Sequence, residues 1–213
     1  MPFGFPSHQG LILPLWRRWP LRFDALALSV GAIMPDVVDG ILAAARGVEF
    51  GQWAGHSLAG AALLAVPLGL ALARALRRAL PRGWVARLDE GAPPRPWPAR
   101  RAVESMAVGV ASHLFFDLIT HRNFLVLWPW YTTRDLFPEW WSARWGEVDV
   151  LVFAKPYPLA PHSLAWGILS VAGIVLFVRC VRRREPAPEP AAPASEAPAA
   201  SEAIALEPDA PPG

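Results

Sequence analysis

The residues of this chain best suited to chemistry lie in one stretch, residues 112–121, which reads Ser-His-Leu-Phe-Phe-Asp-Leu-Ile-Thr-His. In a helix, His113, Asp117 and His121 stand at positions i, i+4 and i+8, so all three project from one face. The other residues are apolar and typical of a membrane segment, where ionisable side chains are costly unless they are paired. Imidazole and carboxylate groups together suit zinc, manganese or iron. The stretch therefore predicts a divalent-metal site, with zinc as the first candidate.

The spacing within this stretch limits which residues can share an ion. His113 and His121 are eight residues apart, about 12 Å along a helix that rises 1.5 Å per residue, so they do not share one ion. Asp117 lies one turn from each of them. We therefore expect Asp117 to bridge two ions, each capped by one histidine, as in hydrolases whose two ions lie about 3.5–4 Å apart.

Hydropathy predicts an all-α fold, a bundle of about four transmembrane helices. Of the 213 residues, 54% are hydrophobic and only 18% are charged. Residues 53–73 and 159–178 each supply the roughly 20 apolar residues that cross a bilayer. Residues 23–45 and 103–120 are weaker candidates because they contain acidic residues. Pro35 adds an expected kink or stop in the first of these.

Charge distribution predicts the orientation of the bundle. The N-terminal arm, the loop between the second and third spans and the C-terminal flank hold most of the 20 Lys and Arg residues. By the positive-inside rule, both termini are then cytoplasmic. The abundance of Arg, Ala and Pro is typical of a GC-rich bacterium, so we expect the bacterial inner membrane. A net charge of +2 favours membrane lipids over nucleic acid as partners, and the single cysteine excludes a disulfide within the chain.

Two further segments differ from the bundle in composition. Residues 122–161 are rich in tryptophan and would lie outside, either as an aromatic belt or cap on the bilayer or as a lid that binds lipid or sugar. Residues 181–213 consist largely of Pro, Ala, Glu and Ser, and we expect them to be disordered. The membrane domain would then comprise residues 1–180.

In this topology, polar residues from all four spans meet near the outer surface. Asp36 and Asp39 approach the outer end of the first span, and His56 and His162 begin the second and fourth spans there. Four of the five histidines would thus lie together. His8, in the N-terminal arm, is expected on the cytoplasmic side, away from them. It would join them only if the arm enters the bundle or if the first span, which contains Pro35, does not cross the membrane fully.

Simpler roles remain open for some of these residues. Asp36 can cap a helix that begins near Val37, and Asp39 can pair with Arg46. Either of the histidines at a helix start can be an interfacial or capping group.

The chain resembles a known family, the bacterial multi-pass membrane proteins catalogued as domain of unknown function 4184, over residues 1–180. The resemblance rests on these motifs in this order: Met-Pro-Phe at the start with Ser7-His8, Met34-Pro35-Asp36, His56-Ser57-Leu58 with Pro67-Leu68-Gly69-Leu70, and Ser112-His113 through Asp117 to Thr120-His121.

More loosely, the arrangement resembles the YdjM-like membrane-bound metal-dependent hydrolases, and the His-x-x-x-Asp step is similar to that of zinc-dependent phospholipase C. These resemblances imply hydrolysis of phosphoesters in lipid or lipid-linked substrates, with Asp117 or Asp36 as the catalytic carboxylate. They imply six metal ligands: His8, Asp36, His56, His113, Asp117 and His121. Two alternatives stay open: the same residues move protons or metal ions across the membrane, or they only satisfy one another inside the bundle.

Overall fold

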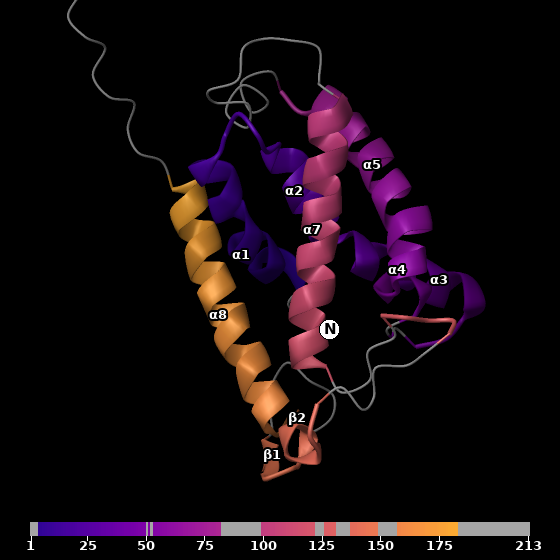
Figure 1. Ribbon diagram of the computed structural model, residues 1–213, viewed down its shortest axis with the longest axis vertical. Coiled ribbons are helices and arrows are strands. Elements are labelled where there is room, and N and C mark those ends of the chain that lie inside the picture. Colours follow the sequence, from indigo (N-terminus) through magenta and orange to yellow (C-terminus); the bar gives the residue numbers. More distant parts are fainter. Residues whose placement is uncertain are drawn as a thin grey trace, which may run out of the picture. The chain divides into compact units, whose positions relative to one another are not determined.

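The fold is known from a computed structural model that describes residues 4–49, 51, 53–81, 99–121, 126–130, 137–148 and 157–182. Helices make up most of this part of the chain, which confirms the all-α prediction (Figure 1). The expected disordered tail, residues 181–213, falls almost entirely outside the described residues. In chain order the elements are α1 Gly4–Arg18, α2 Ala25–Gly31, α3 Met34–Arg46, η1 Ala54–His56, α4 Leu58–Gly60, η2 Ala61–Ala65, α5 Val66–Ala79, α7 Ala99–Thr120, η4 Glu139–Ser142, β1 Gly146–Val148, β2 Tyr157–Leu159 and α8 Pro161–Val181.

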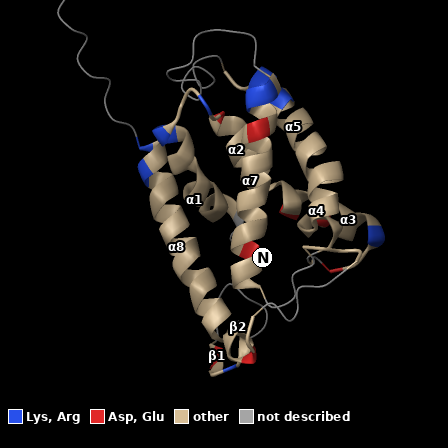
Figure 2. Cartoon of the chain, viewed as in Figure 1, with Lys and Arg blue, Asp and Glu red and all other residues tan. Residues whose placement is uncertain are grey.

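Within the described residues, three helical segments are long and apolar enough to cross a membrane, which makes this a membrane protein. They are Leu58–Ala79, Ala99–Thr120 and Pro161–Val181. Helices α2 and α3 together form a possible fourth span, bent by 43° between Gly31 and Met34. Most of the basic residues drawn in blue lie at one end of the bundle, where α5 and α8 end and α7 begins (Figure 2). We call this the basic end.

The bend between α2 and α3 decides where Asp36 lies. Helix α3 begins at Met34, with Pro35 in its first turn, where proline lacks only an N–H that has no helical partner. Asp36 is therefore already inside the first turn, and the residue at the cap position is Ile33, which makes no side-chain cap bond. The alternative role of Asp36 as the cap of a helix starting near Val37 is wrong.

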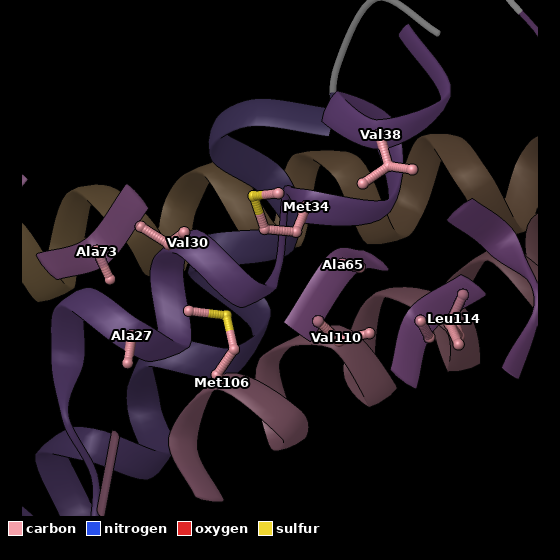
Figure 3. Packing of buried hydrophobic residues seen from close by; sticks show 10 residues of the cluster. Ala27, Val30, Met34, Val38, Ala65, Ala73, Met106, Val110 and Leu114 are labelled. Carbon is pink, nitrogen blue, oxygen red and sulfur yellow. The ribbon is translucent and has the colours of Figure 1, made fainter. Parts of the chain in front are cut away.

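The hydrophobic core lies between α2, α3, α5 and α7 (Figure 3). Met34 and Met106 are almost fully buried at its centre. Glycines let the backbones approach closely there. A Cβ at Gly109 would meet the backbone of α2, and a Cβ at Gly69 would lie 2.6 Å from the sulfur of Met106. Small residues at such crossings are typical of helices packed inside membranes.

Helix α1 is the main element that hydropathy does not predict, and it packs against α8. Gly10 and Gly173 meet where the two helices cross, since a Cβ on either would overlap the other helix's backbone. At the basic end, Arg17 Nη2 donates to the main-chain oxygen of Cys180. From this end, α1 extends back along α8, so that its first turns lie deep in the bundle.

Alanine at Gly173 should loosen this crossing, because the new Cβ would overlap the main-chain oxygen of Ser7. We expect a loss of about 1–3 kcal/mol, the usual cost of overpacking, seen as a lower melting temperature in detergent. Gly167→Ala in the same helix is the matched control, since its Cβ meets nothing within 4 Å. Equal melting temperatures for the two variants would contradict the close contact.

The part of the Trp-rich segment that the structure describes packs on the ends of α7 and α8. Trp141 Nε1 donates to the main-chain oxygen of Ile119 at 3.1 Å. Strands β1 and β2 pair antiparallel beside it. The neighbouring Trp140 is 60% exposed, as an interfacial aromatic side chain would be. Residues 122–125, 131–136 and 149–156 lie outside the described part, so the lid stays a prediction.

Candidate metal centre

Three helices and a short turn bring their polar residues together inside the bundle. His8 comes from α1, Asp36 from α3 and His56 from η1, while His113 and Asp117 come from α7. Groups of these residues have ligand atoms close enough to hold a metal ion, namely His8 with His113 and Asp117, and Asp36 with His56 and His113. His56 and His113 are fully buried and Asp117 is 1% exposed.

The Nε2 atoms of two histidines lie between the carboxylates of Asp36 and Asp117. His56 Nε2 lies 3.4 Å from Asp36 Oδ1 and 3.1 Å from Asp117 Oδ2. His113 Nε2 lies 3.7 and 3.4 Å from the same two oxygens, and the two Nε2 atoms are 3.2 Å apart. Ligands held 2.0–2.1 Å from one tetrahedral zinc ion stand about 3.3–3.4 Å apart. The two imidazoles and either carboxylate are therefore spaced as ligands of one divalent ion would be.

The far nitrogens of both imidazoles are fixed by other groups. His56 Nδ1 lies 2.6 Å from Asp39 Oδ2, and His113 Nδ1 lies 2.8 Å from the main-chain oxygen of Ala32. An acceptor at Nδ1 holds the proton there and leaves the Nε2 lone pair free to bind a metal. Metal-binding histidines usually have such partners, often a carboxylate or a backbone carbonyl.

Asp39 is itself held by the turn that carries His56. Its two oxygens accept hydrogen bonds from the main-chain N–H groups of Trp53 and Gly55, each at 2.6 Å. Gly55 is needed there, because a Cβ would lie 2.6 Å from the main-chain oxygen of Pro35. The alternative pairing of Asp39 with Arg46 is wrong, since the guanidinium of Arg46 lies over the Trp53 ring instead, 5.0 Å from its centroid.

His8 belongs to this cluster, so the expectation that it lies away from the other histidines is wrong. Its Nε2 lies 3.6 Å from Asp117 Oδ1. Its ring stacks on that of His113, with centroids 4.3 Å apart. The prediction from the order of the spans placed His8 wrongly because α1 runs from the basic end along α8 into the bundle. The resemblance to the family motif Ser7-His8 was the one signal that named this residue.

The two histidines at the edges of the cluster have different roles. His121 Nδ1 lies 3.6 Å from Asp117 Oδ1, 3.2 Å from the Asp117 main-chain oxygen and 3.0 Å from Thr120 Oγ1. His162, expected among the converging residues, instead places its Nδ1 3.1 Å from the main-chain oxygen of Trp141. It thereby joins α8 to η4 at the end of the bundle.

The surroundings set the charge of His8 and His56, which lie outside the membrane-spanning helices. Burial and the neighbouring His113 lower the pKa of His8 to about 4, so this imidazole is neutral at pH 7. Burial also acts to lower the pKa of His56, but the three carboxylates around its ring, foremost that of Asp117, outweigh it and raise the pKa to about 11. The proton on His56 sits among carboxylates, where a divalent ion would replace it.

A small cavity adjoins the cluster on the side of His8. It lies between α1, α7 and α8 and has a volume of about 10 Å³, close to the space that one water molecule needs. Hydroxyl groups of Ser7, Thr120 and Ser170 line it together with apolar side chains such as Trp166. The cavity therefore has room for about one water molecule beside His8.

Comparison with known protein families gives one match. The model of the family described as Domain of unknown function (DUF4184) matches residues 1–192. No curated protein and no solved structure matches the chain. The looser resemblances to YdjM-like hydrolases and to zinc-dependent phospholipase C gain no support from these comparisons. The match covers all the residues of the cluster, and the chain belongs to the DUF4184 family.

Proposed function

We propose that this protein is a membrane-embedded, metal-dependent hydrolase of phosphoesters in lipid or lipid-linked substrates. The observation that supports it most is the pair of imidazoles of His56 and His113. Both have Nδ1 fixed by an acceptor and Nε2 turned toward two carboxylate oxygens. Zinc is the first candidate for the ion, with manganese or iron as alternatives, because all three accept histidine and carboxylate ligands.

A purely structural role fits the cluster less well. A network built only for packing would satisfy its buried polar atoms, because an unsatisfied one costs about 1–3 kcal/mol. Asp36 Oδ1 is buried, and among the described residues it has no hydrogen-bond partner. It nevertheless lies 3.4 and 3.7 Å from the Nε2 atoms of His56 and His113. An ion between these atoms would satisfy the oxygen.

Each residue of the cluster would have its own role. His56, His113, Asp36 and Asp117 would hold the ion, and Asp39 would keep the His56 ring in place. When bound, a divalent ion lowers the pKa of water and neutralises charge on a phosphoryl oxygen. The site lies within a bundle whose α8 has an apolar and largely exposed surface. We therefore favour a substrate that itself resides in the membrane.

A direct test uses zinc-loaded protein in vesicles of phosphatidylethanolamine and phosphatidylglycerol, with phosphorus NMR to follow release of the head groups. We expect wild-type protein to produce a new phosphate resonance and Asp36→Asn to lose at least about 100-fold in rate, within the range for removal of a group that stabilises the transition state. His162→Ala, outside the cluster, should retain the wild-type rate.

Bis(4-nitrophenyl) phosphate, a soluble ester, serves as a second substrate in the same assay. If the loaded protein cleaves neither compound, hydrolysis of phosphoesters is the wrong function. Uptake of zinc into the vesicles without any cleavage would instead favour a transporter.

A further inference from the structure

The two oxygens of Asp117 face different pairs of histidines. Oδ2 lies 3.1 Å from His56 Nε2 and 3.4 Å from His113 Nε2. Oδ1 lies 3.6 Å from His8 Nε2 and also 3.6 Å from His121 Nδ1. A carboxylate with a pair of imidazoles at each oxygen is placed to bridge two ions.

The rings of His8 and His113 lie side by side. They stack with 28° between their planes and 4.3 Å between their centroids. Stacked rings place their nitrogens side by side, so each ring can bind an ion of its own.

We propose a second divalent-cation site, formed by Asp117 Oδ1, His8 Nε2 and His121 Nδ1, which makes the centre binuclear with Asp117 as the bridge. This inference rests on the metal centre of the proposed function and adds a ligand from α1. The bridging role of Asp117 agrees with the positions of His113, Asp117 and His121 along α7. The part played by His8 does not follow from that spacing, because His8 lies on α1.

His121 must change its hydrogen bonding to take part. Its Nδ1 lies 3.2 Å from the main-chain oxygen of Asp117, and a nitrogen that donates there carries a proton. A metal ligand must be deprotonated, so the ion would replace this bond. The main-chain oxygen of Asp117 and Thr120 Oγ1 both lie near Nδ1. They would then be additional oxygen ligands available to the second ion.

The second ion would fasten α1 to α7. His8 lies on α1, and Asp117 and His121 lie on or just after α7. Removing that ion should therefore loosen α1 while leaving the first site intact. Hydrogen exchange of the α1 amides reports this without any measurement of activity.

The test loads the detergent-purified full chain with Mn²⁺ and combines elemental analysis with electron paramagnetic resonance. Wild-type protein should hold two ions per chain with a spin-coupled spectrum. His8→Ala should hold one uncoupled ion and show faster exchange in α1. His121→Ala, which changes a partly exposed residue at the end of α7, gives an independent variant if His8→Ala does not fold. His162→Ala is the matched control and should keep two coupled ions.

The outcomes separate this inference from the proposed function. One uncoupled ion in wild type that His8→Ala retains would overturn the second site and leave the first in place. Two coupled ions in both His8→Ala and His121→Ala would also overturn it. No bound ion in wild type would overturn the metal centre itself, and with it both proposals.

Discussion

Asp117→Asn is expected to abolish the stabilisation of this protein by divalent metal ions. In wild type, an ion present at 100 times its dissociation constant should add about 2.7 kcal/mol to the free energy of unfolding. Asparagine keeps the shape of the side chain but removes the charge, and its amide nitrogen cannot act as a second ligand atom. Because Asp117 lies beside four histidines, no other single substitution should weaken metal binding as much.

The measurement for Asp117→Asn is the shift in melting temperature when zinc is added to metal-free protein in detergent. The shift, rather than the melting temperature itself, is compared, because the substitution also changes hydrogen bonds within the bundle. His162→Ala should show the full wild-type shift. If Asp117→Asn shows it as well, Asp117 is not a metal ligand.

Asp39→Asn should weaken metal binding although Asp39 does not face the centre. Its carboxylate holds His56 Nδ1 at 2.6 Å, and loss of such a partner typically costs 10–100-fold in metal affinity. The dissociation constant for zinc, measured by competition with a chelator, should rise by about that factor. Hydrolysis by fully loaded protein should fall much less than affinity does.

A second buried aspartate provides the control for Asp39→Asn. Asp24 is 2% exposed, caps α2 through the N–H of Ala27 and pairs with Arg77. It belongs to the basic end, away from the cluster. Asp24→Asn should lower the melting temperature but leave the affinity for zinc unchanged. An equal loss of affinity in both variants would mean that Asp39 acts only through general stability.

The sequence predicts the parts of this fold that depend on local periodicity. Two strong apolar runs predicted two of the spans, because about 20 apolar residues in a row have few other stable arrangements. Two weaker runs, which contain acidic residues, correspond to α7 and to the bent pair of α2 and α3. The step from His113 to Asp117 was found for the same reason, since residues four apart share a helix face whatever surrounds them. Both residues lie in the cluster as expected.

Tertiary contacts decide the remaining parts of the candidate site. Nothing in the local pattern of α1 indicates that it packs along α8, since the crossing depends on Gly10 meeting Gly173, far away in the sequence. His8 was therefore misplaced by topology alone. Asp39 was left with several possible partners, because its bond to His56 requires the turn at Gly55 to fold back onto α3. His162, like His56, is followed by Ser-Leu-Ala in the sequence. It lies in the first turn of α8, whereas His56 lies in the short turn η1 that folds back onto α3.

The central claim is that the cluster binds a divalent metal, and elemental analysis of the detergent-purified protein tests it most directly. Wild type should contain one or two equivalents of zinc, manganese or iron per chain. His113→Ala removes an imidazole that faces both Asp36 and Asp117, and should lose that metal while still inserting into the membrane. Full retention of metal in His113→Ala, or no metal in either protein after incubation with each ion, would contradict the account.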